Sequence, residues 1–515
     1  MARSKLSYAG CSKSTVMASE EKTQTRQFSG DLNALANNVV AAVSMADVVR
    51  TTMGPRGLDK LLIDQLGNRV ITNDGYTVLV SLKTTHPVSR LLVEIAERQE
   101  MIVGDGTTST VVMAAEMLKE GYRATSEYGI HPSRILAELD EGVGLVAQYL
   151  HEQNNPVSSL DDPLLRNVLR TATASKLDGD QLSSLIMKSV DFLARGNRTD
   201  LRHGILLLRR LGEDIFVDGI AIEQLPQETS FIPSIVDPRV CLLKDSLKFP
   251  LPGSPIENDN ERNDKERGTL LSKLTEAGVN VILTNAPEID TGFKMGLLAR
   301  RIAIVRLGTE ELQLFSRSLE TPMIYGAQVL ADVTMPIFNC HSIELDEDKG
   351  LTILRAPQSG VVATLIIGGA TQETSKERMR TCVDGISGVH YALRGGVVAG
   401  GGIAELNAAR YLERTMVEQG VQKIGYGVLI KGLEVISRQI LDNAGFNGYD
   451  MVVRLRSRPD GIGIDVANGE FIDMVENGVV DSRITRLHAI QIAVHIVKTI
   501  LKIDRNLVME DGAAL

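Results

Sequence analysis

The order of helix-type and strand-type patterns along the chain most constrains its fold. Apolar residues recur at helical spacing from Leu32 to Arg50, from Pro87 to Met101, and again from Thr374 onward. Between about residues 205 and 368, short β-branched runs such as VNVIL and VVATLII alternate with helical segments. The pattern predicts an α+β multi-domain protein in which helical ends flank an inserted α/β middle.

Composition narrows the classes of function. A chain of 515 residues with 43% hydrophobic content exceeds what one core usually supports, so we expect about two to four domains. The net charge of -10 argues against a nucleic-acid partner, because phosphate binding favours a basic face. No apolar run reaches the roughly 20 residues that cross a bilayer, so no membrane partner is expected.

Cysteine usage favours a reducing compartment. The cysteines are far apart and form no CxxC pair: Cys11, Cys241, Cys340 and Cys382. This spacing argues against a zinc site or a dense disulfide framework. The sequence therefore predicts a cytoplasmic protein.

The N-terminal part predicts a tail followed by a helix and a hairpin. Residues 1–30 are rich in Ser, Thr and Lys without an apolar stretch, so we expect a flexible tail and no secretory signal. The runs Lys60–Ile63 and Arg69–Thr72 have the pattern of paired strands joined by a turn. Asp74 then lies just beyond the end of the second strand.

A glycine-rich loop is the first candidate for phosphate binding. No Walker A sequence occurs, but GDGTT at residues 104–108 precedes a helical pattern. Such a loop offers free backbone N–H groups, hydroxyls and a carboxylate suited to Mg²⁺. The alternative is that Asp105 or Thr107 merely caps the helix. Three further glycine-marked turns, in TTMGP, NDG and VVAGGG, favour the phosphate site.

These motifs resemble those of the chaperonin family. TTMGPRGLDK, ITNDGYTVL, VGDGTTSTVV and VDGISGVHYALRGGVVAGGGIAE follow its nucleotide-site motifs in order, and the resemblance continues through NAGFNGYDMVV and ENGVVDSRITR to Ile503. The TNDG, GDGTT and NGVV motifs, with the lysine of TATASK, are most similar to the archaeal and eukaryotic-cytosolic branch (group II). A divergent bacterial member (group III) is the alternative.

The resemblance implies a domain organisation and an activity. It implies a mainly helical equatorial ATP-binding domain (31–158 and 402–515), a small α/β intermediate hinge domain (159–215 and 368–401), and an α/β apical substrate-binding and lid domain (216–367). The implied function is that of an ATP-hydrolysing subunit of a homo-oligomer with two stacked rings of about eight subunits, which encloses non-native polypeptides. The implied cofactors are ATP and Mg²⁺.

The resemblance also assigns roles to single residues. It implies that Asp384 positions or deprotonates the attacking water, that Asp74 is a second carboxylate at the γ-phosphate, and that Lys176 senses that phosphate. Asp105 is the expected Mg²⁺ ligand. The expected nucleotide contacts are Thr52, Gly54, Pro55, Gly75, Gly106, Thr107, Thr108, Ser109, Gly400, Gly401 and Asp481.

Each assignment has a plainer structural alternative. Asp384 and Lys176 have the alternative of solvated charges on helix surfaces. Gly400 and Gly401, expected near the ribose and base, have the alternative of a simple turn, and Asp481, expected at the ribose hydroxyls, that of a helix cap.

The sequence departs from the family in the apical region. The segment SPIENDNERNDKERGTLLSKL replaces a long helical lid protrusion and is shorter and very polar. We expect a long exposed loop from Leu251 to Arg267, leading into a helix that starts near Glu266, with an abbreviated lid tip as the alternative.

Other classes of function compete with an ATP-driven chaperonin. A chaperonin-like scaffold or assembly protein with little ATPase activity is the main alternative, and intact Asp74, Asp105, Lys176 and Asp384 argue against it. A small-molecule kinase is a further alternative, although no second substrate pocket and no VAIK, HRD or DFG motif is present.

Overall fold

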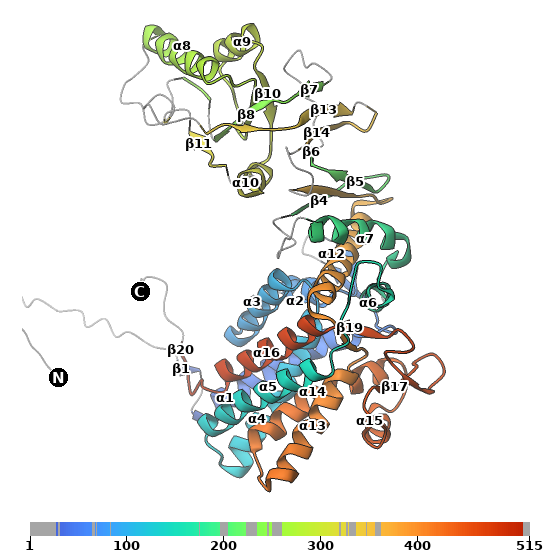
Figure 1. Cartoon of the computed structure of the whole chain (residues 1–515). Coiled ribbons are helices and arrows are strands. Elements are labelled where there is room, and N and C mark those ends of the chain that lie inside the picture. The colour runs from blue at the N-terminus through green and yellow to red at the C-terminus, as the bar shows by residue number, and fades with distance from the viewer. Residues whose placement is uncertain are drawn as a thin grey trace, which may run out of the picture.

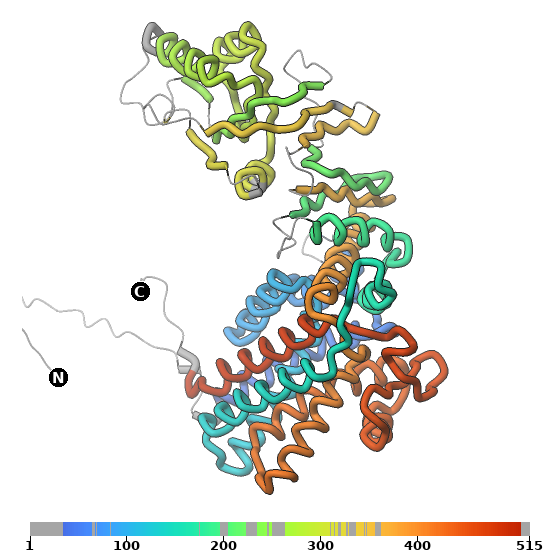
Figure 2. The backbone as a smooth tube through the Cα atoms, viewed as in Figure 1, coloured from blue at the N-terminus to red at the C-terminus, as the bar shows by residue number. Residues whose placement is uncertain are grey.

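The computed structural model describes residues 27–28, 31–63, 67, 69–82, 84–174, 176–195, 204–222, 234–244, 247–249, 260–318, 321–325, 328, 336–346, 348–355 and 362–507. Three bodies lie along the length of the molecule, a helical region, a middle region and an upper region (Figure 1). The backbone leaves the helical region, passes through the middle region to the upper region, and returns the same way (Figure 2). The predicted α+β architecture with an inserted middle is confirmed.

The helical region is built from both parts of the chain. Its first part contains β1 Gln27–Phe28, α1 Asp31–Val49, the 3₁₀ helix η1 Arg50–Thr52, β2 Lys60–Ile63, β3 Arg69–Thr72, α2 Gly75–Ser81, α3 Pro87–Ile102, α4 Thr107–Tyr128 and α5 Pro132–Glu152. Its second part contains β16 Val397–Ala399, α13 Ile403–Gln419, α14 Ile424–Asn443, α15 Gly448–Arg456, β17 Ile462–Ile464, β18 Phe471–Asp473, β19 Val480–Ser482, α16 Arg483–Ile500 and β20 Asn506–Leu507. The predicted hairpin is confirmed, because β2 and β3 pair antiparallel.

Helix α4 is the centre of the helical region. It packs against α1, α14 and α16, and its buried side chains include Val111, Met113, Met117 and Leu118. A helix that is apolar on most of its surface is stable only when other helices cover it. Since α1 and α4 come from the first part of the chain and α14 and α16 from the second, the two parts form one core.

The middle region links the other two. It contains α6 Pro163–Thr173, α7 Gly179–Arg195, β4 Ile205–Arg209, β5 Ile215–Asp218, β15 Ala363–Ile367 and α12 Gln372–Gly395. Its sheet has β15 in the centre, parallel to β4 and antiparallel to β5. Helix α12 packs on α6 and α7 and also contacts α16 of the helical region.

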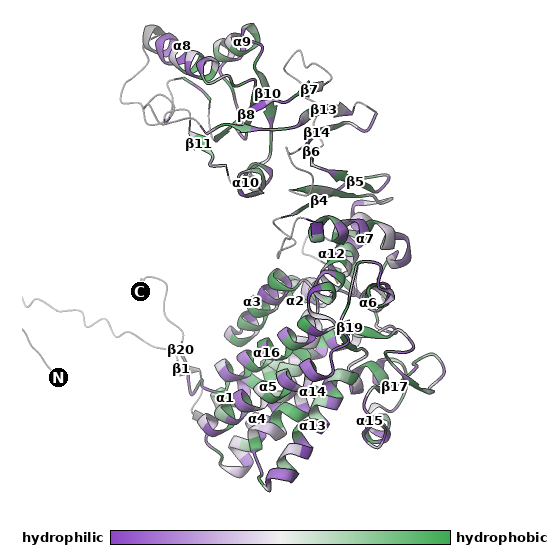
Figure 3. Ribbon diagram, viewed as in Figure 1, coloured by the Kyte–Doolittle hydropathy of each residue, from purple (hydrophilic) through white to green (hydrophobic). Residues whose placement is uncertain are grey.

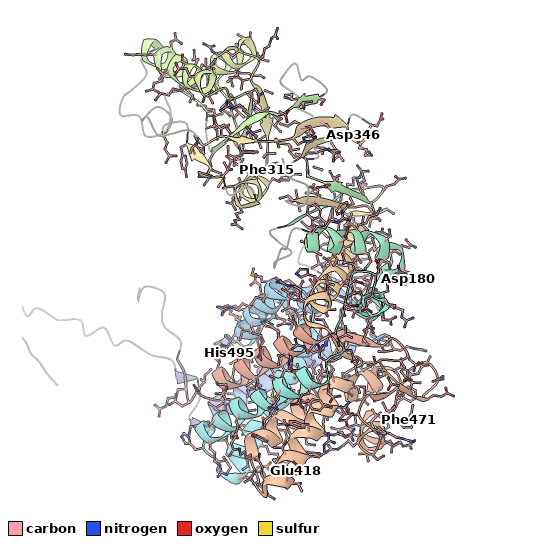
Figure 4. All side chains as sticks on the ribbon, in the orientation of Figure 1. Asp180, Phe315, Asp346, Glu418, Phe471 and His495 are labelled. Atoms are coloured by element: carbon pink, nitrogen blue, oxygen red, sulfur yellow. The ribbon has the colours of Figure 1, made fainter. Side chains whose placement is uncertain are left out.

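The upper region consists of small sheets with helices. It contains β6 Ile220–Ile222, β7 Ser234–Val236, β8 Arg239–Lys244, α8 Asn260–Glu276, β9 Val281–Thr284, α9 Thr291–Ala299, β10 Ala303–Arg306, α10 Thr309–Ser318, β11 Ile324–Tyr325, β12 Phe338–Asn339, β13 Ser342–Asp346 and β14 Leu351–Arg355. The parallel strands β10, β9 and β8 are buried on both faces, as their continuous apolar runs predict. One face packs on α8 and α9, and the other on α10, where Phe315 is fully buried (Figure 4).

The predicted loop from Leu251 to Arg267 is partly wrong. Residues 251–259 lie outside the described residues, but α8 already begins at Asn260, six residues before the expected start near Glu266. The helix was missed because NERNDKERG contains no apolar residue, so its first turns carry no helical hydrophobic period. Figure 3 colours much of the α8 ribbon as hydrophilic, and Arg267 pairs with Asp264 one turn earlier at 2.6 Å.

Two other expectations concern the ends of the chain and membranes. The predicted tail, residues 1–30, lies outside the described residues except for Gln27–Phe28, which pair with β20. Within the described ranges, none of the helices has the length and apolar character needed to span a bilayer.

Candidate functional site

A cavity of about 510 Å³ lies where the middle region meets the helical region. Its walls contain nearly every residue that the sequence motifs suggested: Thr52, Gly54, Pro55, Asp74, Gly75, Asp105, Gly106, Thr107, Thr108, Ser109, Lys176, Asp384, Gly401 and Asp481. These residues come from segments up to about 400 positions apart. A volume of this size fits the range of roughly 300–1,000 Å³ that small-ligand sites occupy.

Two helices begin at this cavity without a side-chain cap. Gly106 precedes α4 with φ 80°, and Gly402 precedes α13 with φ 78°, both in the left-handed conformation that glycine adopts readily. Neither helix start has a capping hydrogen bond from a side chain. The first N–H groups of α4 are therefore available to an anionic ligand, whereas the Ile403 N–H at the start of α13 already donates to the Gly400 carbonyl at 3.1 Å. Both helix dipoles favour negative charge at the cavity.

The observed N-caps of α4 and α16 rule out two of the alternative roles that the sequence left open. Asp105 does not cap α4, since Gly106 is the N-cap and Asp105 Oδ1 accepts a hydrogen bond from the Gly106 N–H at 2.7 Å. Asp481 does not cap α16, because Ser482 takes that position and accepts from the Thr485 N–H. Both carboxylates line the cavity instead.

Asp74, by contrast, does cap a helix. Its Oδ2 accepts from the Thr77 N–H at 3.0 Å and from the Thr77 hydroxyl at 2.5 Å, which fixes the start of α2. Arg380 of α12 lies 3.8 Å from the same oxygen. The carboxylate still lines the cavity, so capping holds Asp74 in place at the wall.

The middle region contributes an ion pair to the cavity. Asp384 of α12 is only 6% exposed, and its carboxylate pairs with the ammonium group of Lys176, which precedes α7. Asp384 is therefore not a solvated surface charge, which was its plainer alternative. Because both residues belong to the middle region, any movement of that region relative to the helical region moves this pair.

Arg486 of α16 is a cavity residue that received no role from the sequence motifs, although it is the last residue of ENGVVDSRITR. Its Nη2 lies 3.4 Å from Asp105 Oδ2, and its Nε lies 3.5 Å from Asp481 Oδ2. Burial alone would lower the pKa of Arg486, but the nearby carboxylates, above all Asp481, outweigh burial, so the pKa is raised. Burial raises the pKa of Asp481, while the Arg486 charge opposes that rise. The sequence signal that could have identified Arg486 is a charged residue on the same helix face as Ala489, Ile490 and Ala493, which are buried.

Part of the cavity wall is apolar. Ile403, Leu455, Ile464 and Met474 line the cavity and belong to one hydrophobic cluster. Gly401 adjoins this wall, and a Cβ at that position would lie 2.8 Å from Met474 Cε. Gly400 is not among the residues that form the walls; a Cβ there would meet the Val479 backbone at 3.1 Å, so its small size serves the packing of β16 on β19. The cavity thus combines polar groups suited to phosphates with an apolar wall suited to a flat heterocycle.

The residues fit a magnesium ion that is shared with a phosphate ligand. In the part of the chain that the structure describes, no group of three or more His, Cys, Asp or Glu side chains is arranged to hold a metal. Mg²⁺ does not need such a group, because it is usually bound by one or two carboxylates together with phosphate oxygens and waters. Asp105 is 23% exposed toward the cavity and supplies one carboxylate beside the start of α4.

Fold and cavity together define a nucleotide-binding protein in which the middle region brings charged groups to the polar part of the cavity. The TCP-1/cpn60 chaperonin family matches residues 45–511. The chain belongs to this family, and its function is that of an ATP-dependent chaperonin.

Individual relatives agree with that membership. Thermosome subunit alpha of Methanothermobacter thermautotrophicus is 28% identical over 495 residues, covering 91% of this chain and 90% of the relative. Thermosome subunit beta of Desulfurococcus mucosus is 29% identical over 487 residues, covering 87% and 95%. A crystal structure of a group III chaperonin in the open state is similar with a TM-score of 0.71 at 26% identity, covering 91% of this chain and 98% of that one. The scaffold alternative is not favoured.

Proposed function

We propose that this chaperonin subunit hydrolyses ATP in the cavity between its helical and middle regions and uses the resulting movement to enclose and release non-native polypeptides. The observation that carries the proposal is the meeting of two uncapped helix starts with the Asp384–Lys176 pair in one cavity. The helix starts supply donors for phosphate, and the pair supplies a carboxylate and a cation for the transferred phosphoryl group.

The polar part of the cavity would work through positioning and electrostatics. The backbone N–H groups that follow Gly106, with the hydroxyls of Thr107 and Thr108, bind the phosphate oxygens. Asp384 accepts a hydrogen bond from the attacking water and holds it in line with the γ-phosphate, while Lys176 turns its charge toward that phosphate. Mg²⁺ held at Asp105 supplies charge neutralisation of the phosphate oxygens when it is bound.

The rest of the cavity would select the nucleoside. The apolar walls around Ile464 and Met474 cover the base, and Asp481 accepts hydrogen bonds from the ribose hydroxyls. Gly401 allows the backbone to approach the ribose, and the role of Gly400 there stays a prediction.

The regions then correspond to the expected domains. We propose that the helical region is the equatorial ATP-binding domain, the middle region the intermediate hinge, and the upper region the apical client-binding domain, close to the expected bounds of 31–158 and 402–515, 159–215 and 368–401, and 216–367. The strand pairing argues for small shifts of these bounds, because β5 and β15 pair within the middle region and β16 pairs with β19 of the helical region. Thermosome subunits and a group III chaperonin as relatives support a ring assembly, and two stacked rings of about eight identical subunits in the cytoplasm stay our prediction.

The test is refolding of a chemically denatured enzyme with and without ATP, using the wild-type protein, Asp384→Ala and Asp180→Ala. Asp180 is an exposed aspartate of α7 outside the cavity (Figure 4), so it controls for loss of an acidic charge in the middle region. We expect ATP-dependent refolding from the wild type and Asp180→Ala, and nucleotide binding without turnover or refolding from Asp384→Ala. Absence of ATP turnover from the wild-type protein would refute hydrolysis and support the scaffold alternative.

A further inference from the structure

Glu405 is a buried acid that the proposed chemistry does not use. It lies in the first turn of α13, is 1% exposed, and has no hydrogen-bond partner for either carboxylate oxygen among the residues that the structure describes. Burying a carboxylate without a partner is costly, so such a group calls for an explanation. Burial raises the pKa of Glu405, and the positive charge of Arg486 opposes that rise.

Arg486 is surrounded by more carboxylates than one guanidinium can bind closely. Its guanidinium lies 3.4 Å from Asp105 Oδ2, 3.5 Å from Asp481 Oδ2 and 3.5 Å from Ser109 Oγ. All three separations are long compared with the roughly 2.7–2.9 Å of a strong charge-assisted hydrogen bond. The attraction of Glu405 is also among the causes that raise the pKa of Arg486. One cation is therefore shared among three carboxylates, and Glu405 is the one without a direct contact.

The contact between Arg486 and Asp105 conflicts with metal binding. A divalent cation at Asp105 repels a guanidinium a few ångströms away, and in a buried site this repulsion is weakly screened. Arg486 must then give up Asp105. It keeps Asp481 at 3.5 Å, and a second buried anion would compensate for the lost contact, because a poorly paired buried guanidinium is costly.

We propose that Glu405 is the alternate partner of Arg486: when Asp105 ligates Mg²⁺, Arg486 exchanges its contact with Asp105 for one with Glu405. The inference rests on the proposed metal site at Asp105. Glu405 acts through Arg486 and is a positioning residue, not a catalytic one. The exchange makes metal binding at Asp105 more favourable, because the displaced cation is received by an anion already in place.

The experiment measures metal dependence without turnover. ADP binding to the assembled full-length protein is followed by calorimetry at stepped Mg²⁺ concentrations, which gives the Mg²⁺ concentration at half-maximal effect. For Glu405→Gln we expect this concentration to rise roughly fivefold or more, with ADP affinity in EDTA unchanged. An unchanged value in Glu405→Gln overturns the exchange while leaving the proposed ATP site intact.

Glu116→Gln is the matched control. Glu116 is also buried, at 7% exposure, and pairs with Arg438 at 3.2 Å outside the cavity. The same chemical change at Glu116 should leave the Mg²⁺ dependence unaltered. An equal rise in both variants would show a general loss of stability and would overturn the assignment.

A double-mutant cycle separates this exchange from independent effects. In an Arg486→Met background, Glu405→Gln should produce no further change in Mg²⁺ dependence, whereas additive effects would overturn the coupling. If Arg486→Met does not fold, Arg486→Lys takes its place, since it keeps the charge and should keep most of the Glu405→Gln effect. If wild-type ADP binding shows no Mg²⁺ dependence at all, the metal site at Asp105 is wrong and the exchange is refuted with it.

Discussion

The lower part of the molecule and the upper region bury different kinds of polar group. In the helical and middle regions, the buried polar side chains include the carboxylates of Glu116, Asp384, Glu405 and Glu434. In the described part of the upper region, they are all hydroxyls: Thr284, Thr321, Ser342 and Thr352. Buried charge is expensive unless it is paired or used by a site: Glu116 and Glu434 pair with arginines, and Asp384 lines the cavity, whereas hydroxyls are satisfied locally. The upper region is therefore held together mainly by apolar packing, and the chemistry lies below it.

The strongest way to test this division is to remove one partly buried cation from each part. Lys176→Met keeps the aliphatic stem but leaves Asp384 without its cation, and we expect ATP turnover to fall about 10²-fold or more, because a charge aimed at the phosphate is lost. Steady-state phosphate release, with ATP affinity measured in parallel, provides the test.

The matched change in the upper region is Arg267→Met. Arg267 is 23% exposed and pairs with Asp290 at 2.9 Å, comparable to the 18% exposure of Lys176. Its removal should lower the unfolding temperature slightly and leave turnover unchanged. Full ATP turnover in Lys176→Met would show that the Asp384–Lys176 pair is only a structural contact. The proposed difference between the two parts of the molecule would then be wrong.

A smaller effect is expected from glycines in left-handed turns. Gly106 has φ +80° at the start of α4, and a Cβ added there would have its nearest neighbouring atom at 3.6 Å, so Gly106→Ala is opposed by backbone conformation alone. That cost is roughly 1–2 kcal/mol, and relaxation of the turn should weaken ATP binding about tenfold by displacing the N–H donors.

Gly278, which follows α8 in the upper region, has φ +70° and provides the control. Gly278→Ala should lower stability by a similar amount without changing ATP affinity. Calorimetric ATP binding and thermal unfolding of both variants distinguish the outcomes. If Gly106→Ala altered stability alone, the free N–H groups of α4 would not be a phosphate site.

The sequence predicts features that depend on neighbouring residues better than contacts between distant segments. Turn chemistry is local, so GDGTT and NDG predict the glycine-marked turns that line the cavity, and the apolar runs VNVIL and VVATLII predict the buried strands β9 and β15. The charged neighbours of Arg486 come from the loop before α4, from β19 and from α13, which are distant in the sequence, and no local pattern encodes their arrangement. Helix α8 was predicted to start late because its first turns consist of charged residues stabilised by neighbouring ion pairs.

The smallest predicted effect is that the contributions of Glu405 and Glu344 to stability change with pH in opposite directions. Burial raises the pKa of Glu405 above its ordinary value of 4.5, so the folded state holds this proton more tightly, and its contribution to stability is lost as pH rises through the raised pKa. The pKa of Glu344 is lowered by the Ser342 hydroxyl and by Arg355, so its contribution is present above 4.5 and is lost as pH falls through the lowered pKa.

Glu405→Gln should therefore raise the unfolding temperature near pH 7.5, and this gain should shrink toward pH 4.5. Glu344→Gln should lower the unfolding temperature near pH 7.5 by an effect worth less than about 1 kcal/mol, since solvent screens a side chain that is 40% exposed. Thermal unfolding of both variants across this pH range measures the two slopes. Slopes of the same sign would mean that Glu405 is stabilised by pairing, as Glu344 is, and the contrast between the two regions would then lie in ligand binding alone.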